Sequence, residues 1–171
     1  MSAAVVVADS GPIIHLSRVG LLELLPKLYG SIVVPRAVFD EVVHDGAGQP
    51  GSTELAGAAW AEIAEHDAED PLFLSFLQTL QIGESAAISI AYGKKAGLVL
   101  IDDNRARMAA RALRIAVKGT LGLLVLAKQR GHVDSVAPKI RALLAQNVWI
   151  SAEVVRRALR EAGEPDLDAG G

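Results

Sequence analysis

Residues 98–103 read Leu98-Val99-Leu100-Ile101-Asp102-Asp103, an uninterrupted apolar run that ends in two acids. The same pattern occurs near the N-terminus, where Val5-Val6-Val7-Ala8 leads into Asp9. Short apolar runs without polar alternation are typical of strands buried on both faces, as in a parallel sheet. In open α/β sheets, ligands bind just beyond the carboxyl ends of the strands. The two runs therefore predict a parallel sheet with carboxylates gathered at one edge.

Segments with helical periodicity separate the predicted strands along the rest of the chain. The expected strands are 3–8, 32–34, 98–101 and 115–117, and the expected helices are 13–28, 35–43, 71–80, 83–95, 105–113, 120–130, 135–145 and 151–162. Gly20 and Pro26 interrupt the helical pattern of residues 13–28 and can split it. The segment 54–70 fits a weak helix or a strand equally well. Strands that alternate with helices imply a sheet covered on both sides. We predict a single-domain three-layer α/β/α fold over residues 1–163, with a central parallel sheet of four to five strands, followed by a disordered tail over residues 164–171.

The composition supports one globular domain and excludes several kinds of site. The chain has 171 residues, of which 51% are hydrophobic and 22% charged, as expected for a folded domain with its own core. It contains no cysteine, which excludes disulfides, thiolate metal sites and a cysteine nucleophile. We find no signal-peptide pattern and no apolar run near the ~18 residues that span a bilayer. We therefore expect a cytoplasmic protein without a membrane partner.

Charge is distributed unevenly along the chain. Residues 1–93 contain three bases against twelve acids, a balance of −9, whereas residues 94–171 contain fourteen bases against eight acids, a balance of +6. A molecule with this asymmetry can bind a polyanion on one face although its net charge is −3.

Glu84 is the acid whose position argues most strongly for a site. It stands in the first turn of the helix predicted over residues 83–95, and small or apolar residues follow it at i+3, i+4 and i+7. This spacing places its carboxylate on the stripe that faces the sheet, where a charge is costly unless it is paired or binds a metal. The alternative is an acid favoured by the helix dipole, which explains the first turn but not the inward face.

The other acids have simpler alternatives. Asp9 starts a good turn sequence, and Asp102 would also serve as a helix cap. Glu41 lies at the border of an apolar stripe with Val38 and Val42, and taken alone it is better explained as a surface acid. The repetition of the acidic ending on two strands favours a common site.

Convergence of these acids predicts a metal ion. Carboxylates within about 4–6 Å of each other repel, and a divalent cation removes that conflict. Oxygen-only ligands favour Mg²⁺ or Mn²⁺ over zinc. The four histidines, at positions 15, 44, 66 and 132, are scattered and are expected to be surface or capping residues. An acidic site of this kind suits phosphoryl chemistry.

Arginines follow the second acidic strand end. Arg107, Arg111 and Arg114 are spaced i, i+4 and i+7, with Arg105 nearby. A row of arginines beside an acidic metal site is suited to a phosphate backbone, and the alternative is a solvated helix face. We predict that these four arginines bind the phosphate backbone of a nucleic acid.

Five stretches together resemble a known family. They are Asp9-Ser10-Gly11-Pro12-Ile13-Ile14, Val33-Val34-Pro35-Arg36-Ala37-Val38-Phe39-Asp40-Glu41-Val42, Gly83-Glu84-Ser85-Ala86-Ala87-Ile88, Leu100-Ile101-Asp102-Asp103 and Lys118-Gly119-Thr120-Leu121-Gly122. Singly each is weak, but in this order they resemble a VapC-related prokaryotic subfamily of the PIN-domain superfamily, over nearly the whole chain.

The resemblance implies a Mg²⁺- or Mn²⁺-dependent endoribonuclease, the toxin of a type II toxin–antitoxin pair. Its partners would be RNA, a small antitoxin protein and a second copy of the chain in a homodimer. By position, Asp9, Glu41 and Glu84 take the first three acidic roles, and either Asp102 or Asp103 takes the fourth, with a slight preference for Asp103. The resemblance also implies that the hydroxyls of Ser10 and Thr120 support the carboxylates.

One departure from the family pattern keeps other functions open. Many PIN domains carry a further acid shortly after the fourth, where this chain has Asn104. The alternative is therefore a non-catalytic PIN-like module that binds RNA or a partner protein. A Mg²⁺-dependent phosphatase for small substrates is a third hypothesis, which the arginine-rich helix disfavours.

Overall fold

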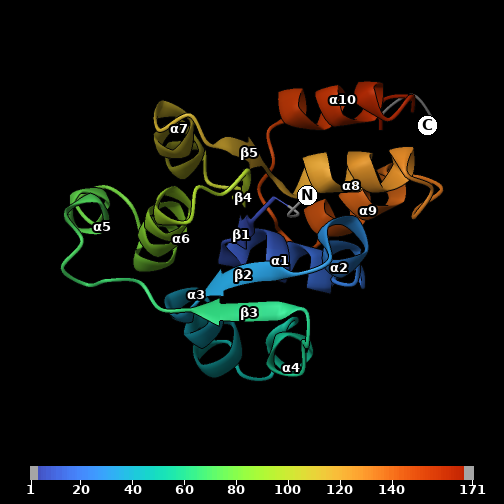
Figure 1. Cartoon of the computed structure of the whole chain (residues 1–171). Coiled ribbons are helices and arrows are strands. Elements are labelled where there is room, and N and C mark those ends of the chain that lie inside the picture. Colours follow the sequence, from blue (N-terminus) through green and yellow to red (C-terminus); the bar gives the residue numbers. More distant parts are fainter. Residues whose placement is uncertain (1–3, 168–171) are drawn as a thin grey trace.

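Five parallel strands form one sheet in the computed structural model, which describes residues 4–167 (Figure 1). The sheet has the order β3-β2-β1-β4-β5. Its strands are β1 (Val6–Ala8), β2 (Ile32–Pro35), β3 (Ala61–Ala64), β4 (Leu98–Leu100) and β5 (Ala116–Lys118). The predicted parallel sheet is confirmed, with the larger of the two expected strand numbers.

Helices connect the strands and cover both sides of the sheet (Figure 1). They are α1 (Ser10–Arg18), α2 (Leu24–Tyr29), α3 (Arg36–Asp40), the π-helical turn η1 (Glu41–Asp45), α4 (Ser52–Ala56), α5 (Pro71–Phe76), α6 (Ile82–Gly93), α7 (Asn104–Ala112), α8 (Thr120–Gln129), α9 (Ala137–Ala145) and α10 (Ala152–Glu161). Across residues 4–167, no helix combines the length and apolar character that crossing a membrane requires.

The strand residues alternate between two cores. Val6 and Ala8 of β1 point into the core formed with α1, α2, α8, α9 and α10, whereas Val7 points into the core under α6 and α7. In β4, Leu100 faces the first core and Val99 faces the second. Because both faces of the central strands β1 and β4 are buried, these strands need apolar residues at every position, which is the run pattern seen in the sequence.

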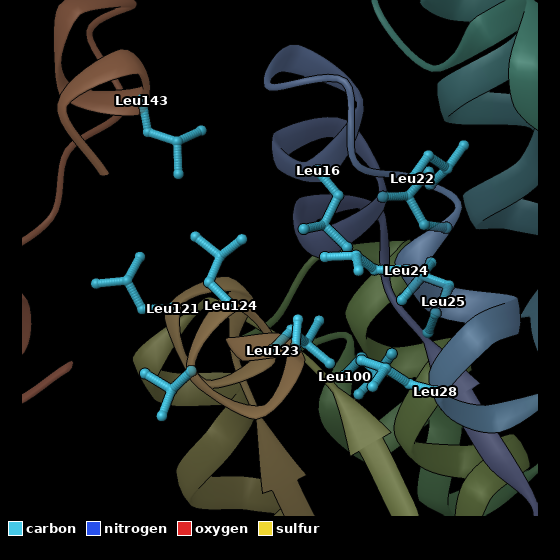
Figure 2. Close-up of a cluster of buried hydrophobic side chains, with 14 of the residues drawn as sticks. Leu16, Leu22, Leu24, Leu25, Leu28, Leu100, Leu121, Leu123, Leu124 and Leu143 are labelled. Carbon is cyan, nitrogen blue, oxygen red and sulfur yellow. The ribbon is translucent and has the colours of Figure 1, made fainter. Parts of the chain in front are cut away.

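Leucines build most of the larger core. Figure 2 shows leucines of the α1–α2 region, β4, α8 and α9 gathered on one side of the sheet. Full burial of each such side chain contributes about 1.5–3 kcal/mol. This packing holds α1 and α8 against the same face of the sheet. Helix α1 begins just after β1, and α8 begins just after β5.

Several predicted boundaries need correction. The segment 13–28 is split at Gly20, as its interrupted pattern allowed, because Gly20 adopts a positive φ of 69° between α1 and α2, whereas Pro26 lies within α2. The ambiguous segment 54–70 contains the end of α4 and the edge strand β3. The predicted helix 105–113 ends at Ala112, so Arg114, with a φ of 60°, lies beyond it rather than on its face.

The predicted tail starts too early. Glu164 accepts hydrogen bonds from side chains and amides at the start of α9, so it belongs to the folded body of the protein. Of the other residues predicted as tail, 168–171 lie outside the described residues.

Candidate active site

The carboxyl edge of the sheet collects the predicted acids. The chain runs from β1 to β2 and β3 on one side and then crosses to β4 and β5 on the other, so β1 and β4 flank the point where the strand order reverses. Ligands bind at such switch points in open α/β sheets. Asp9 follows β1 directly, and its amide donates a 2.9 Å hydrogen bond to Leu100 O, which keeps the ends of β1 and β4 together.

Asp9 is a buried carboxylate without a full set of partners. The residue is 5% exposed, and its Oδ1 atom has no hydrogen-bond donor among the described residues. Burial raises the pKa of Asp9 to about 7, against the effect of the Ser10 amide. The negative charges of Glu84, Glu41 and Asp102 raise the pKa further. The four acids therefore act on one another electrostatically at this edge.

Glu41 is the acid placed beside Asp9. Ser10 Oγ donates to Glu41 Oε1 at 3.1 Å, so the hydroxyl that follows Asp9 orients the second carboxylate. A methyl group at Gly83 would lie 3.2 Å from Glu41 Oε2 and 3.3 Å from Asp9 Oδ1. The absent side chain of Gly83 thus leaves room for two carboxylate oxygens against the start of α6. Glu41 is not the isolated surface acid that its own sequence context favours.

The π-helical turn η1 begins at Glu41. The amide of Gly46 donates to Glu41 O at 2.9 Å, which is an i+5 hydrogen bond. A methyl group at Gly46 would lie 2.7 Å from Val42 O, closer than a Cβ atom tolerates. Single π turns occur frequently at functional sites. Here the turn sets the backbone from which Glu41 reaches Asp9.

Glu84 is both an acid at the start of a helix and an acid of the candidate site, the two interpretations that its sequence position allowed. Its Oε2 atom accepts a 3.0 Å hydrogen bond from the amide of Gln81, so it caps the start of α6. Burial raises the pKa of Glu84, the Gln81 amide opposes this, and the charges of Asp103 and Glu41 raise it. Glu84 is therefore both a helix cap and a member of the acidic edge.

Asp102 is held more firmly than the other acids. Its Oδ1 atom accepts a 2.6 Å hydrogen bond from the Thr120 amide, and its Oδ2 atom accepts bonds from Thr120 Oγ1 (2.6 Å) and His15 Nδ1 (2.7 Å). Burial alone would raise the pKa of Asp102, but the bonds from His15 and Thr120 lower it below its usual value. Asp102 thereby joins β4 to α1 and α8.

Asp103 faces a different part of the edge. Its Oδ1 atom caps α7 by accepting from the Ala106 amide at 2.9 Å. Its charge acts on Glu84, whereas that of Asp102 acts on Asp9. The two neighbouring acids therefore serve opposite ends of the site, and both stay candidates for the fourth acidic role.

A cleft of about 480 Å³ opens at the Glu84 end of this edge. Polar and charged side chains of Gln81, Glu84, Asp103 and Arg105 line it together with Leu77. Arg105 can bind a phosphate in this open hollow, whereas the carboxylates of Glu84 and Asp103 repel a phosphate unless a cation is bound beside them.

The acids match a hard divalent cation in their donor chemistry. As their side chains are placed, no three acidic or histidine residues within 4–167 lie close enough together to bind a metal ion jointly. Carboxylate oxygens of Asp9 and Glu41 nevertheless both lie beside Gly83, and the Asp9 oxygen lacks any donor in the described part of the chain. A buried acceptor without a donor, in an oxygen-only set, fits Mg²⁺ or Mn²⁺.

The predicted arginines divide into two groups. Arg105 lines the cleft, and a methyl group at Gly119 would lie 3.2 Å from Arg107 Nη1 and 2.8 Å from Asp102 Oδ1, so Arg107 reaches the acidic edge. Arg111 is close enough to lower the pKa of Arg107. Arg114 lines a second hollow with Tyr92 and Lys95, away from the acids.

His15 is the residue that the sequence analysis missed. It was expected to be a surface or capping residue, but it is partly buried and donates to Asp102 Oδ2 through Nδ1. Gly11 and His15 are four residues apart, so they lie on one face of α1. A methyl group at Gly11 would lie 3.1 Å from Asp102 Oδ2, so this face of α1 lies against Asp102. The partner of His15 lies 87 positions away, so the local sequence gives no signal for this contact.

Comparison with known proteins identifies the family. The family model described as a PIN domain matches residues 5–164. The chain belongs to the PIN-domain family. PIN domains are generally nucleases, so the coarse class of this protein is a nuclease-type hydrolase with a nucleic-acid substrate, in a family that typically uses divalent metals. The search of curated proteins found no match. The family prediction is confirmed, whereas the VapC-related subfamily remains a prediction.

Proposed function

We propose that this PIN domain is a Mg²⁺- or Mn²⁺-dependent endoribonuclease that hydrolyses RNA phosphodiesters. The observation that carries the proposal is Asp9, a buried carboxylate with an unpartnered oxygen and a pKa of about 7 among three further acids. A carboxylate left in this state costs stability, and a bound cation removes the cost. Perturbed acids of this kind cluster at functional sites.

Asp9 and Glu41 are the residues that would hold the ion, with Glu84 and the Asp102/Asp103 pair completing the acidic edge. When bound, a divalent cation supplies Lewis-acid chemistry, which activates water and neutralises charge developing on the phosphate. Ser10 fixes the orientation of Glu41 through its hydroxyl. Thr120 and His15 fix Asp102. The protein thus supplies prearranged carboxylates whose geometry does not depend on the substrate.

Glu84 is the acid that borders both the cleft and the acidic edge. Only its Oε2 atom accepts a hydrogen bond among the described residues, which leaves Oε1 available for a water molecule. We assign Glu84 to orienting the water that attacks the phosphorus in line with the leaving oxygen. Arg105 lines the cleft and Arg107 reaches the acidic edge, and both would bind the phosphate.

The expected biological role is that of a toxin, controlled by a small antitoxin protein, and the expected assembly is a homodimer. This part rests on the resemblance of the five sequence stretches to VapC-related proteins. Induced expression in a bacterial host tests it, since the native protein should arrest growth and the Asp9→Asn variant should not.

Cleavage of labelled single-stranded RNA tests the enzymatic proposal. The native protein should cleave when Mg²⁺ or Mn²⁺ is added and not with a chelator. Asp9→Asn should lower the rate by about 100-fold or more, because it removes one charged ligand. Asp134→Asn is the matched control, since Asp134 is an exposed aspartate in the α8–α9 connection.

A second readout does not depend on activity. Calorimetric titration with Mn²⁺ should give binding to the native protein and a large loss of affinity in Asp9→Asn. RNA binding without cleavage by the native protein would favour a non-catalytic module. Hydrolysis of small phosphate monoesters alone would favour a phosphatase.

A further inference from the structure

Helix α10 carries arginines beside the arginines of α7, although the two helices are far apart in the sequence. Figure 1 shows α7 and α10 on either side of the outer strand β5. Val155, Ala158 and Leu159 bury the inner face of α10, so its arginines point outward. Arg157 is close enough to Arg107 for its positive charge to lower the pKa of that guanidinium.

Because α7 and α10 flank β5 and Arg157 lies on the exposed face of α10, we group Arg107 and Arg111 from α7 with Arg157 from α10 as one region of like charge. We call it the arginine cluster. Burial and the charge of Arg111 lower the pKa of Arg107, the charge of Asp102 raises it, and the charge of Arg157 lowers it. No member forms an ion pair with any residue in the described part of the chain. Mutual repulsion of unpaired cations destabilises the folded protein unless an anion binds between them.

Neutralising acids are available on α10 but are not used. Glu153 and Glu161 lie four residues before and after Arg157, a spacing at which helical ion pairs form. Neither pairs with Arg157. The guanidinium of Arg157 is exposed and free to contact a ligand.

Arg107 connects the cluster to the acidic edge. Its Nε atom is buried without an acceptor among residues 4–167, and its Nη1 atom approaches Gly119 next to Asp102. One end of the cluster thus lies at the site of the proposed reaction, and the other end lies on α10. A flexible polyanion can follow this line, because successive phosphates repeat along its backbone.

We propose that α10 completes the substrate surface, with Arg157 binding the nucleic-acid backbone at a phosphate next to the one held near Arg107 and Asp102. This inference rests on the proposed nuclease function for its choice of ligand. A nucleic-acid strand repeats its phosphates along the backbone, and within residues 4–167 no acid forms an ion pair with these arginines, which favours such a strand over a single small anion.

Binding of a short fluorescent single-stranded RNA to Asp9→Asn protein, over a range of salt concentrations, tests the assignment. The Asp9→Asn background prevents cleavage during the measurement. Adding Arg157→Ala should weaken binding by about 3–10-fold and lower the slope of log affinity against log salt by about 0.7, the value of one phosphate contact. Arg157→Lys should recover much of the slope. Lys27→Gln, an exposed charge on α2, is the matched control and should change neither quantity.

The outcomes separate this inference from the proposed function. If the native protein cleaves RNA but Arg157→Ala binds with unchanged affinity and slope, α10 is not part of the surface. If the native protein does not cleave but binding still depends on Arg157, the surface stands and the enzymatic proposal fails. Absence of measurable RNA binding would overturn the assignment, as would competition by poly-glutamate as strong as that by RNA, which would indicate an acidic protein partner.

Discussion

Asp9 and Glu164 are both nearly buried carboxylates, and the protein surrounds them in opposite ways. The side chain of Glu164 is 8% exposed and has a pKa lowered to about 2, whereas Asp9 is 5% exposed and has a pKa raised to about 7. Burial pushes both values upward, but only Glu164 has enough donors to reverse the effect. These donors are Lys128 Nζ (2.7 Å), Ser135 Oγ (2.8 Å) and the amides of Val136 (2.7 Å) and Ala137 (2.9 Å).

The difference separates a structural acid from a functional one. Glu164 ties the segment after α10 to the start of α9 and leaves no bonding capacity unused. Asp9 lies at the switch point of the sheet with an oxygen that receives no hydrogen bond from residues 4–167. A buried charge that the fold does not neutralise is a position where a ligand gains affinity.

Neutralising Asp9 is expected to have the largest effect. Because the folded pKa of Asp9 lies above its unfolded value of 3.8, the native state keeps a proton that the unfolded state releases. Without divalent cations, the free energy of unfolding should therefore fall as the pH rises from about 4 to about 7, because Asp9 loses its proton less readily in the folded protein. Asp9→Asn should raise the free energy of unfolding at pH 8 by about 1–4 kcal/mol, measured by urea denaturation with a chelator.

Adding Mg²⁺ should reverse this order by stabilising the native protein and not the variant. Asp134→Asn should respond to pH and Mg²⁺ as the native protein does. A variant that is less stable than the native protein at pH 8 without cations would contradict the view that Asp9 is an unsatisfied charge.

Removing the charge at Glu164 should have the opposite sign. Its folded pKa of about 2 lies below the unfolded value of 4.5, so its contribution is present above about 4.5 and is lost as the pH falls toward 2. Glu164→Gln should lower the free energy of unfolding at neutral pH by about 1–3 kcal/mol. Acid unfolding followed by circular dichroism measures both effects. RNA cleavage per folded molecule should not change, and a loss of cleavage would assign Glu164 a role beyond the fold.

Substitution of Thr120 tests whether Asp102 is a structural acid like Glu164 or a functional acid like Asp9. Asp102 accepts several hydrogen bonds, as Glu164 does, but it lies at the acidic edge, as Asp9 does. Thr120→Val removes the hydroxyl donor but keeps the amide bond to Oδ1. We expect a loss of about 1–2 kcal/mol in unfolding free energy and a lower cleavage rate at saturating RNA. Thr120→Ser keeps the hydroxyl and should restore both. A change in stability without any change in rate would make Asp102 a purely structural acid.

The sequence was sufficient for the sheet because its central strands are buried on both faces. The runs before Asp9 and Asp102 carry that requirement in every residue. The edge strand β3 has only partly buried or exposed residues, Ala61–Ala64, so its pattern was ambiguous. Local periodicity also does not reveal the π turn at Glu41, which depends on the i+5 bond from Gly46.

The site was less predictable than the fold because its decisive contacts are long-range. His15 and Asp102 are 87 positions apart, and a single histidine on a helix gives no indication of such a partner. The order of the acids indicated that a site exists. It did not distinguish Asp102 from Asp103, because adjacent residues at a strand end point in different directions.

Asp103→Asn should give the smallest effect on stability and separates the two neighbouring acids. Asparagine caps a helix as well as aspartate does, so the bond to the Ala106 amide remains and the melting temperature should stay the same. Loss of the charge lowers the pKa of Glu84, since Asp103 contributes to raising it. We expect a cleavage rate reduced less than about 10-fold, against a much larger loss in Asp102→Asn, whose charge acts on Asp9. The reverse ranking in a cleavage assay at fixed Mg²⁺ would move the fourth acidic role to Asp103 and leave Asp102, like Glu164, to the fold.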